Sequence, residues 1–354
     1  MAILNFPNAA GQPIDGSFTY EDNGVLYSWD GYKWTANSEQ AYDDRYVEVT
    51  GDTMTGDLTV PSLNGGQLAG LRNQLINSGF QVDQRGLSGV SLSGTKYCLD
   101  RWVAVSGATV TKLNVSVGGL PNCVSYSGGN TAGYLRQAIE LPGVGTHNGP
   151  FNTSGLDWTF SVYSDAVPKF EAFYADDNSG LANKTNWIDL TDLTSTGKTI
   201  RTNATGTLTQ YSITFSNSPG PAATNKCLVI AFRGGGFYAG PQFEPGPVAT
   251  PFEQRPIGLE LSLCQRYFFK ETVDASYKGY QLNKQSSTVR YAFPEEMRTV
   301  PTISALPTGG SSGSPTTGTY ATPTTRSVFP KMVTSQDGTV VTTILAGTEF
   351  DAEL

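Results

Sequence analysis

Apolar and polar residues alternate in short runs along most of the chain. Within YLRQAIEL, the apolar residues on one parity are Leu135, Ile139 and Leu141. The opposite parity carries Tyr134, Arg136 and Glu140. Within WTFSVYS, apolar residues alternate in the same way with a second set that includes Tyr163. Successive side chains of a strand point to opposite faces, so these runs predict strands with one face on a core and the other polar.

Runs of this kind recur from residue 71 to about residue 255 and are separated by turn clusters such as SGGN and DDNSG. Many short strands with turns at intervals predict a β-sandwich or jelly roll over 71–255. A strand is also predicted within this range at Leu75–Phe80. Residues 256–354 predict a second, smaller β-sandwich domain that begins with a brief helix in GLELSLCQRYFF. Its Gly/Ser/Thr-rich segment 308–325 is predicted to be a long exposed loop.

The first 40 residues predict a small three-stranded β meander. Asn-Gly and Asp-Gly pairs separate its apolar runs, and these pairs favour hairpin turns because they tolerate positive φ. The tyrosines and tryptophans would form one face, which serves as the module's own core or as a docking surface. Residues 41–70 form a connector that contains VTGDTMTGDLTVPSLNG.

Composition supports a mostly β fold. The chain has 354 residues, of which only 15% are charged and 40 are glycine. Its net charge of −8, without any lysine–arginine cluster, excludes nucleic acid as a partner. No apolar run reaches about 18 residues, so no membrane insertion is expected. The N-terminus lacks the pattern of a signal peptide, and we therefore expect no export by an N-terminal signal.

The sequence assigns no catalytic residue. His147 is the single histidine and lies in a Gly/Pro-rich turn, while GGSSG and STGKT lack the strand–turn–helix context of a nucleophile or phosphate loop. The four scattered cysteines predict buried free thiols, and no zinc-ligand spacing occurs. One turn groups oxygen ligands that suit a structural calcium ion. These candidate ligands are Asp176, Asp177 and Asn178.

A glycan-binding surface is better supported than an active site. Sugars bind to aromatic rings through their C–H faces, and amides, carboxylates and guanidinium groups bind their hydroxyls. The polar positions of the alternating strands in 71–255, and residues near them, supply such side chains. The candidates are Tyr134, Arg136, Tyr163, Tyr174, Trp187 and Arg233. The same residue types are enriched in subunit interfaces, which is the alternative for this set.

Several motifs in a fixed order resemble phage tail-fibre receptor-binding proteins. They are LRNQLINSGFQVDQRG with YCLDRW, then GPQFEPGPVATPFEQRPIGLELSLCQRYF, then VRYAFPEEMRTVPTISA and the ending FDAEL. The connector is similar to those of marine and cyanobacterial phage fibres. The resemblance implies a homotrimeric virion tail fibre, assembled in the host cytoplasm, whose jelly roll is similar to carbohydrate-binding modules and carries a structural calcium.

The resemblance also implies partners. The N-terminal module would attach to phage tail or adaptor proteins, and the β domains would bind host surface polysaccharide or lipopolysaccharide without catalysis. In the trimeric connector, the side chains expected at the threefold axis are Met54, Leu58 and Val60. Two alternatives stay open at this point: a tail spike that degrades polysaccharide, and a purely structural head or decoration fibre.

Overall fold

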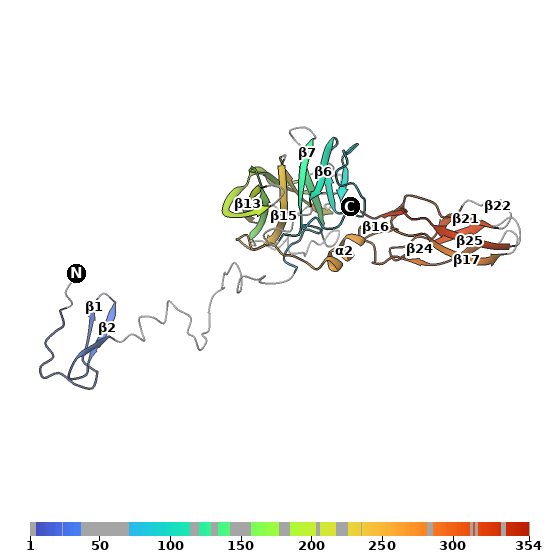
Figure 1. Cartoon of the computed structure of the whole chain (residues 1–354). Helices are drawn as coiled ribbons and strands as arrows, with labels where there is room; N and C mark the ends of the chain where they lie inside the picture. The colour runs from blue at the N-terminus through green and yellow to red at the C-terminus, as the bar shows by residue number, and fades with distance from the viewer. Residues whose placement is uncertain are drawn as a thin grey trace. The chain divides into compact units, whose positions relative to one another are not determined.

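The computed structural model describes residues 5–22, 24–36, 71–113, 120–128, 134–141, 157–176, 185–202, 206–216, 226–234, 236–281, 286–311, 314–315, 318–333 and 338–353. The chain divides into two compact units, Met1–Val60 and Pro61–Leu354 (Figure 1). Strand makes up 53% of the structure, which confirms the mostly β class. The boundary predicted after residue 255 lies within the second unit, which contains a large sandwich and several smaller sheets.

The first unit contains the predicted meander. Strands β1 (Thr19–Asp22), β2 (Val25–Trp29) and β3 (Trp34–Ala36) form one antiparallel sheet. The turn before β3 has Gly31 at φ +95°, and Asp30 Oδ1 accepts hydrogen bonds from the backbone amides of Tyr32 and Lys33. Its aromatic residues gather around Trp34, whose ring stacks on Phe6 at 5.3 Å. None of the described side chains of residues 5–36 is fully buried.

The second unit is dominated by two six-stranded antiparallel sheets that form a β-sandwich. In spatial order, the first sheet contains β11 (Thr185–Asp192), β10 (Lys169–Ala175), β14 (Cys227–Arg233), β8 (Tyr134–Glu140), β5 (Trp102–Ala104) and β4 (Lys96–Leu99). The second sheet contains β12 (Thr194–Thr202), β13 (Gly206–Ser216), β9 (Asp157–Ser164), β15 (Gly236–Pro245), β7 (Cys123–Gly128) and β6 (Ala108–Leu113). Figure 1 shows β13, β15, β7 and β6 of this second sheet. Consecutive strands often lie in opposite sheets, as in jelly rolls.

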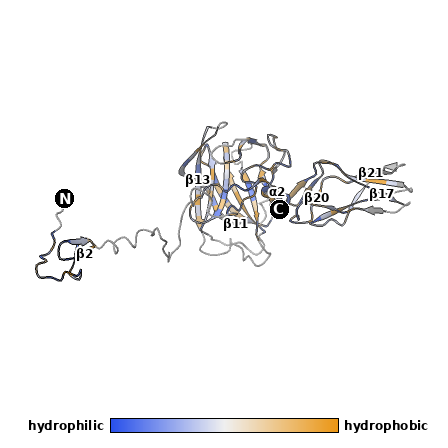
Figure 2. Ribbon diagram, turned by 60° about the horizontal axis from the view of Figure 1, so that its bottom comes forward, coloured by the Kyte–Doolittle hydropathy of each residue, from blue (hydrophilic) through white to orange (hydrophobic). Residues whose placement is uncertain are grey.

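Aromatic side chains from both sheets fill the sandwich. Phe160 of β9 stacks on Phe170 of β10 at 4.6 Å and lies 5.7 Å from Phe232 of β14. Burial of such a ring contributes about 1.5–3 kcal/mol, and each aromatic pair adds about 0.5–1.5 kcal/mol. The apolar positions predicted from the alternation, including Leu135 and Trp158, belong to this core. Hydrophobic residues accordingly concentrate in the strands of the sandwich (Figure 2).

The face of the second sheet that carries the polar residues of the alternation is not open to solvent. Thr159, Ser161 and Gln210 are all buried, and Thr159 Oγ1 donates to the carbonyl oxygen of Gly246 at 2.7 Å. On the same side, Leu120 and Leu208 belong to a small apolar cluster against which Phe252 packs. For these residues of the second sheet, the alternation therefore predicts the face correctly but not the exposure.

The segment 71–80 has no strand, contrary to the prediction for Leu75–Phe80. It is held by side chains from the segment that follows β15. The carboxylate of Glu253 accepts hydrogen bonds from the amides of Leu71 and Asn73, the latter at 2.6 Å. Arg255 donates to the carbonyl oxygen of Leu75 at 3.0 Å. Because buried backbone groups need partners, these side chains take the place of a neighbouring strand.

Helix α2 (Ile257–Gln265) leads from the sandwich to the smaller sheets, as predicted. Pro256 precedes its first turn, where an acidic residue is favourable. That residue is Glu260, which is buried and forms an ion pair with Arg255 at 3.4 Å. Glu260 also accepts a hydrogen bond from the amide of Asn77, so the start of the helix is attached to the 71–80 segment.

Three small sheets follow α2. One contains β16 (Phe268–Lys270), β26 (Glu349–Asp351) and β20 (Thr302–Ile303). The next contains β17 (Ala275–Gln281), β25 (Gly338–Ile344), β21 (Thr308–Ser311) and β22 (Ser314–Pro315). The third contains β18 (Ser286–Thr288), β24 (Ser327–Val333) and β19 (Tyr291–Ala292), with β23 (Thr319–Ala321) paired to β24. Phe293, Val328, Ile344 and Phe350 form their shared core.

The prediction of a long exposed loop over 308–325 is therefore wrong in part. The strands β21, β22 and β23 lie in this range, and β21 pairs with β25 over Thr308–Ser311. Gly, Ser and Thr have low hydrophobicity, but their backbones can form ladder hydrogen bonds when a partner strand is present. The pairing partner lies about thirty residues further along the chain, and local composition contains no information about it.

The prediction of buried free thiols agrees with the structure. Cys98, Cys123 and Cys264 are buried thiols without a disulfide, and Cys227 is also buried. In the described part of the chain, no helix is long and apolar enough to cross a membrane. His147 and the connector residues Met54, Leu58 and Val60 lie outside the described residues.

Candidate functional site

Three adjacent strands of the first sheet place charged and aromatic side chains on its outer face. Strand pairing aligns Lys169 of β10 with Arg233 of β14, and Arg233 with Tyr134 of β8. In a neighbouring row, Glu171 and Arg136 flank Ala231. We call these five residues, Lys169, Arg233, Tyr134, Glu171 and Arg136, the arginine–tyrosine cluster.

The cluster contains one ring with two guanidinium groups close to it. The Arg136 guanidinium carbon lies 5.0 Å from the centroid of the Tyr134 ring, and that of Arg233 lies 5.6 Å from it. Arg233 Nη2 also donates to Glu171 Oε1 at 2.7 Å. Cation–π contacts and a charge-assisted hydrogen bond thus hold the ring and both arginines in one arrangement.

The members of the cluster differ in exposure. Arg136 and Glu171 are 5% and 7% exposed, whereas Tyr134 and Arg233 are half-buried. Lys169 is exposed and forms an ion pair with Asp192 at 2.8 Å. A ligand at this face would contact Tyr134, Arg233 and Lys169, while the buried Arg136 and Glu171 position the first two.

This arrangement has the chemistry of a small polar binding surface. A half-exposed tyrosine ring offers an apolar face for the C–H groups of a sugar and a hydroxyl at its edge. The guanidinium of Arg233 donates several hydrogen bonds in a fixed plane. Because Glu171 already accepts from Arg233, the orientation of that plane is set before a ligand binds, which lowers the entropic cost of binding.

Only part of the predicted glycan-binding set belongs to this cluster. Tyr134, Arg136 and Arg233 come together, but Tyr174 is fully buried in the sandwich core, where no glycan can contact it. Tyr174 follows Phe173 on β10, so it points to the opposite face from Glu171. This candidate was wrong because the segment FEAFYA is aromatic on both parities and its pattern leaves the inward face ambiguous.

Tyr163 lies on the other sheet. It packs against the apolar cluster of Leu208 and Ala239 on the outer side of the second sheet, and burial raises the pKa of its hydroxyl. It therefore cannot act together with Tyr134, because the sandwich core lies between the two sheets. Trp187 belongs to edge strand β11 of the first sheet, and its side chain lies outside the described residues.

Lys169 and Glu171 were missed by the sequence reasoning. Their alternation with Phe170 and Ala172 was a usable signal, since it places both on the polar parity of β10. What the pattern lacked was the strand order. Residues 169, 233 and 134 meet only because β10, β14 and β8 are neighbours in space.

The calcium prediction is only partly within the described chain. Asp176 follows β10, whereas Asp177 and Asn178 lie outside the described residues. Among the residues that the structure describes, no group of three or more His, Cys, Asp and Glu side chains is arranged to hold a metal ion. The calcium site stays a prediction.

Comparisons with known proteins give only distant likenesses. No family model matches the chain, and no curated protein matches it significantly. Among solved structures, it is similar to the family 11 carbohydrate-binding module of the cellulosomal cellulase Lic26A-Cel5E of Clostridium thermocellum, with 16% identity and a TM-score of 0.23. That match covers 46% of this chain and 100% of the module.

A second likeness is to discoidin II of Dictyostelium discoideum. The identity is 10% and the TM-score 0.20, and the match covers 77% of this chain and 94% of discoidin II. TM-scores near 0.2 are too low to carry a fold or a function from one protein to another. The assignment of function therefore depends on the residues of this chain.

Proposed function

We propose that this protein is a glycan-binding adhesin, and that the arginine–tyrosine cluster contacts the glycan. The observation that carries this proposal is the half-exposed Tyr134 ring on the outer face of the sandwich, with the guanidinium carbons of Arg136 and Arg233 5.0 Å and 5.6 Å from its centroid. A ring of this kind binds the C–H face of a sugar, and Arg233 donates to its hydroxyl or carboxylate groups. Each site would bind weakly, because its contact surface consists of a few side chains.

We further propose that the adhesin is a homotrimeric phage tail fibre that binds host surface polysaccharide or lipopolysaccharide without catalysis. The support for this setting is the ordered series of fibre-like motifs from residue 49 to the C-terminus. Three linked sites would raise the overall avidity by about 10²–10⁴ over one site if the glycan can reach them together. The partly exposed aromatic residues of the meander support a docking role for the N-terminal module.

The experiment is binding of the full chain to immobilised bacterial lipopolysaccharides and capsular polysaccharides, measured by biolayer interferometry. We expect Tyr134→Ala and Arg233→Ala each to weaken binding at least tenfold, and Arg233→Lys to restore only part of it. Tyr280→Ala is the matched control, because Tyr280 is 69% exposed and lies on β17, in another sheet. Circular dichroism verifies that all variants are folded.

Three outcomes would contradict parts of the proposal. If Tyr134→Ala and Arg233→Ala bind as tightly as the unchanged chain, the cluster is not the site. If the same samples release oligosaccharide from the polysaccharide, the protein is a degrading spike. If no polysaccharide binds, the adhesin role is wrong. If light scattering gives a mass other than three times the chain mass, the proposed homotrimer is wrong.

A further inference from the structure

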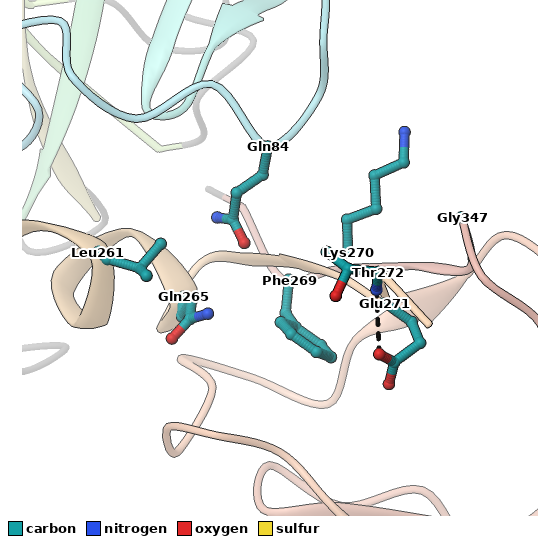
Figure 3. A pocket seen from close by; sticks show the side chains of 8 residues that line it. All are labelled: Gln84, Leu261, Gln265, Phe269, Lys270, Glu271, Thr272 and Gly347. Atoms are coloured by element: carbon teal, nitrogen blue, oxygen red, sulfur yellow. Dashed lines mark hydrogen bonds between the residues drawn. The ribbon is translucent and has the colours of Figure 1, made fainter. Parts of the chain in front are cut away.

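A pocket of about 620 Å³ lies where the sandwich meets the smaller sheets of the second unit. Figure 3 shows its lining: Leu261 and Gln265 project from α2, Phe269 follows on β16, and Gln84 reaches in from the segment before β4. None of these residues belongs to the arginine–tyrosine cluster. The pocket is within the size range of small-molecule sites.

Apolar groups form much of the pocket wall. The ring of Phe269 is half-buried and stacks against Phe350, with centroids 5.9 Å apart and planes 17° from parallel. Since Phe350 is fully buried in the core of the small sheets, Phe269 is held in place. Leu261 and Gln265 are four residues apart on α2, so they lie on one face of the helix and border the same space.

One polar group of the pocket has a fixed orientation. Gln84 Nε2 donates to Asp100 Oδ1 at 2.7 Å and to the carbonyl oxygen of Phe268 at 2.9 Å. Both N–H groups are thereby used, which fixes Oε1 as an acceptor. Among the described residues, none donates a hydrogen bond to this oxygen. It can therefore accept a hydrogen bond from a ligand hydroxyl without any side-chain rearrangement.

The charged side chains at the pocket already have partners. Lys270 Nζ lies 3.0 Å from Glu349 Oε1. The carboxylate of Glu271 accepts hydrogen bonds from the amide of Thr272 at 3.0 Å and from the hydroxyl of Tyr291. An acidic ligand would find no unpaired cation among these groups, so the pocket favours a neutral molecule over an acidic one.

We propose that this pocket binds a neutral saccharide unit of one or two sugars. A pyranose ring presents an apolar C–H face, which fits Phe269 and Leu261, and hydroxyls at its edge, which fit the amides of Gln84 and Gln265. Gln84 selects for a hydroxyl donor. Because Lys270 already forms an ion pair with Glu349, an acidic sugar would find no free cation there. This second site shares no residue with the arginine–tyrosine cluster, so each of the two binding proposals can be refuted without the other.

The test is saturation-transfer NMR and calorimetry on the full chain, with the methyl glycosides of glucose, galactose and mannose and with N-acetylglucosamine. We expect at least one probe to bind with a Kd of about 1–10 mM. Leu261→Arg places a long charged side chain in the pocket and should weaken binding at least tenfold. Gln265→Ala keeps the helix and removes one polar contact, so a smaller loss is expected.

Leu259→Arg is the matched control, because Leu259 is on the same helix, is 42% exposed and does not line the pocket. It should bind the probe like the unchanged chain, and so should the cluster variant Arg233→Ala. The proposal is overturned if no probe binds at about 20 mM, or if Leu261→Arg binds as well as Leu259→Arg. Binding of phenol without any of the saccharides would show an apolar site instead.

Discussion

Glu353 joins the C-terminal segment to the sandwich through two buried arginines. Its carboxylate forms an ion pair with Arg101, and with Arg85 at 3.2 Å. The side chains of Glu353, Arg101 and Arg85 are 4%, 1% and 10% exposed. Arg298 also donates to the backbone carbonyl of Glu353 at 3.0 Å. The two ends of the second unit are thus linked by charges that are largely removed from water.

We expect Glu353→Ala to lower the free energy of unfolding by about 3–5 kcal/mol, because it leaves Arg101 buried without its carboxylate. Glu353→Gln should cost less, since the amide oxygen still accepts one hydrogen bond. A loss of this size is a large fraction of the total stability of an ordinary domain, about 5–15 kcal/mol. The magnitude follows from burial rather than from the number of contacts.

The measurement is urea unfolding followed by the fluorescence of Trp102 and Trp158, which are buried in the sandwich. Glu349→Gln is the control, because Glu349 forms an ion pair with Lys270 in which the side chains are 36% and 30% exposed. A pair with that exposure contributes about 0–1 kcal/mol. The reasoning is refuted if Glu353→Ala changes the stability by no more than Glu349→Gln.

Three further predictions concern single groups. Burial raises the pKa of Asp100 to about 6, so its contribution to stability is fully present below about pH 4 and is lost as pH rises through 6, by about 3 kcal/mol. Urea unfolding of the unchanged chain and of Asp100→Asn should diverge over this range; parallel curves would contradict it. A Cβ at Gly240 would lie 2.7 Å from a leucine side-chain carbon, whereas Gly206, also at positive φ, has open space; Gly240→Ala should lower Tm more than Gly206→Ala in thermal unfolding. Burial raises the pKa of Cys98 to about 12 and that of Cys123 to about 11, so a thiol reagent should modify them only after unfolding, and rapid native modification would disprove this.

The motifs that resemble phage fibres have a structural role in this chain. Glu253, Arg255 and Glu260 bind the backbone of residues 71–77, about 180 positions earlier in the sequence. Arg101 of YCLDRW and Glu353 of FDAEL form an ion pair with each other. These motifs therefore hold the sandwich, α2 and the C-terminal segment together, and the residues of the arginine–tyrosine cluster lie outside them.

The sequence by itself determined the class of the fold and, in strands that alternate clearly, the face of each residue. Alternation with a period of two is a local property, so Leu135 and Arg136 were assigned to opposite faces correctly. It also determined the helix after Pro256 and the meander at the N-terminus, because proline and Asn-Gly or Asp-Gly turns act on their immediate neighbours.

Tertiary structure alone decided which of these faces are covered and which residues meet. Tyr134, Arg233 and Glu171 form one cluster because β8, β14 and β10 are neighbours, and that order depends on long-range pairing. The same is true of the strands at 308–321, which were predicted to be a loop, and of Thr159, whose polar face is buried. Contacts between distant segments set burial and strand order, and no local pattern of residues encodes them.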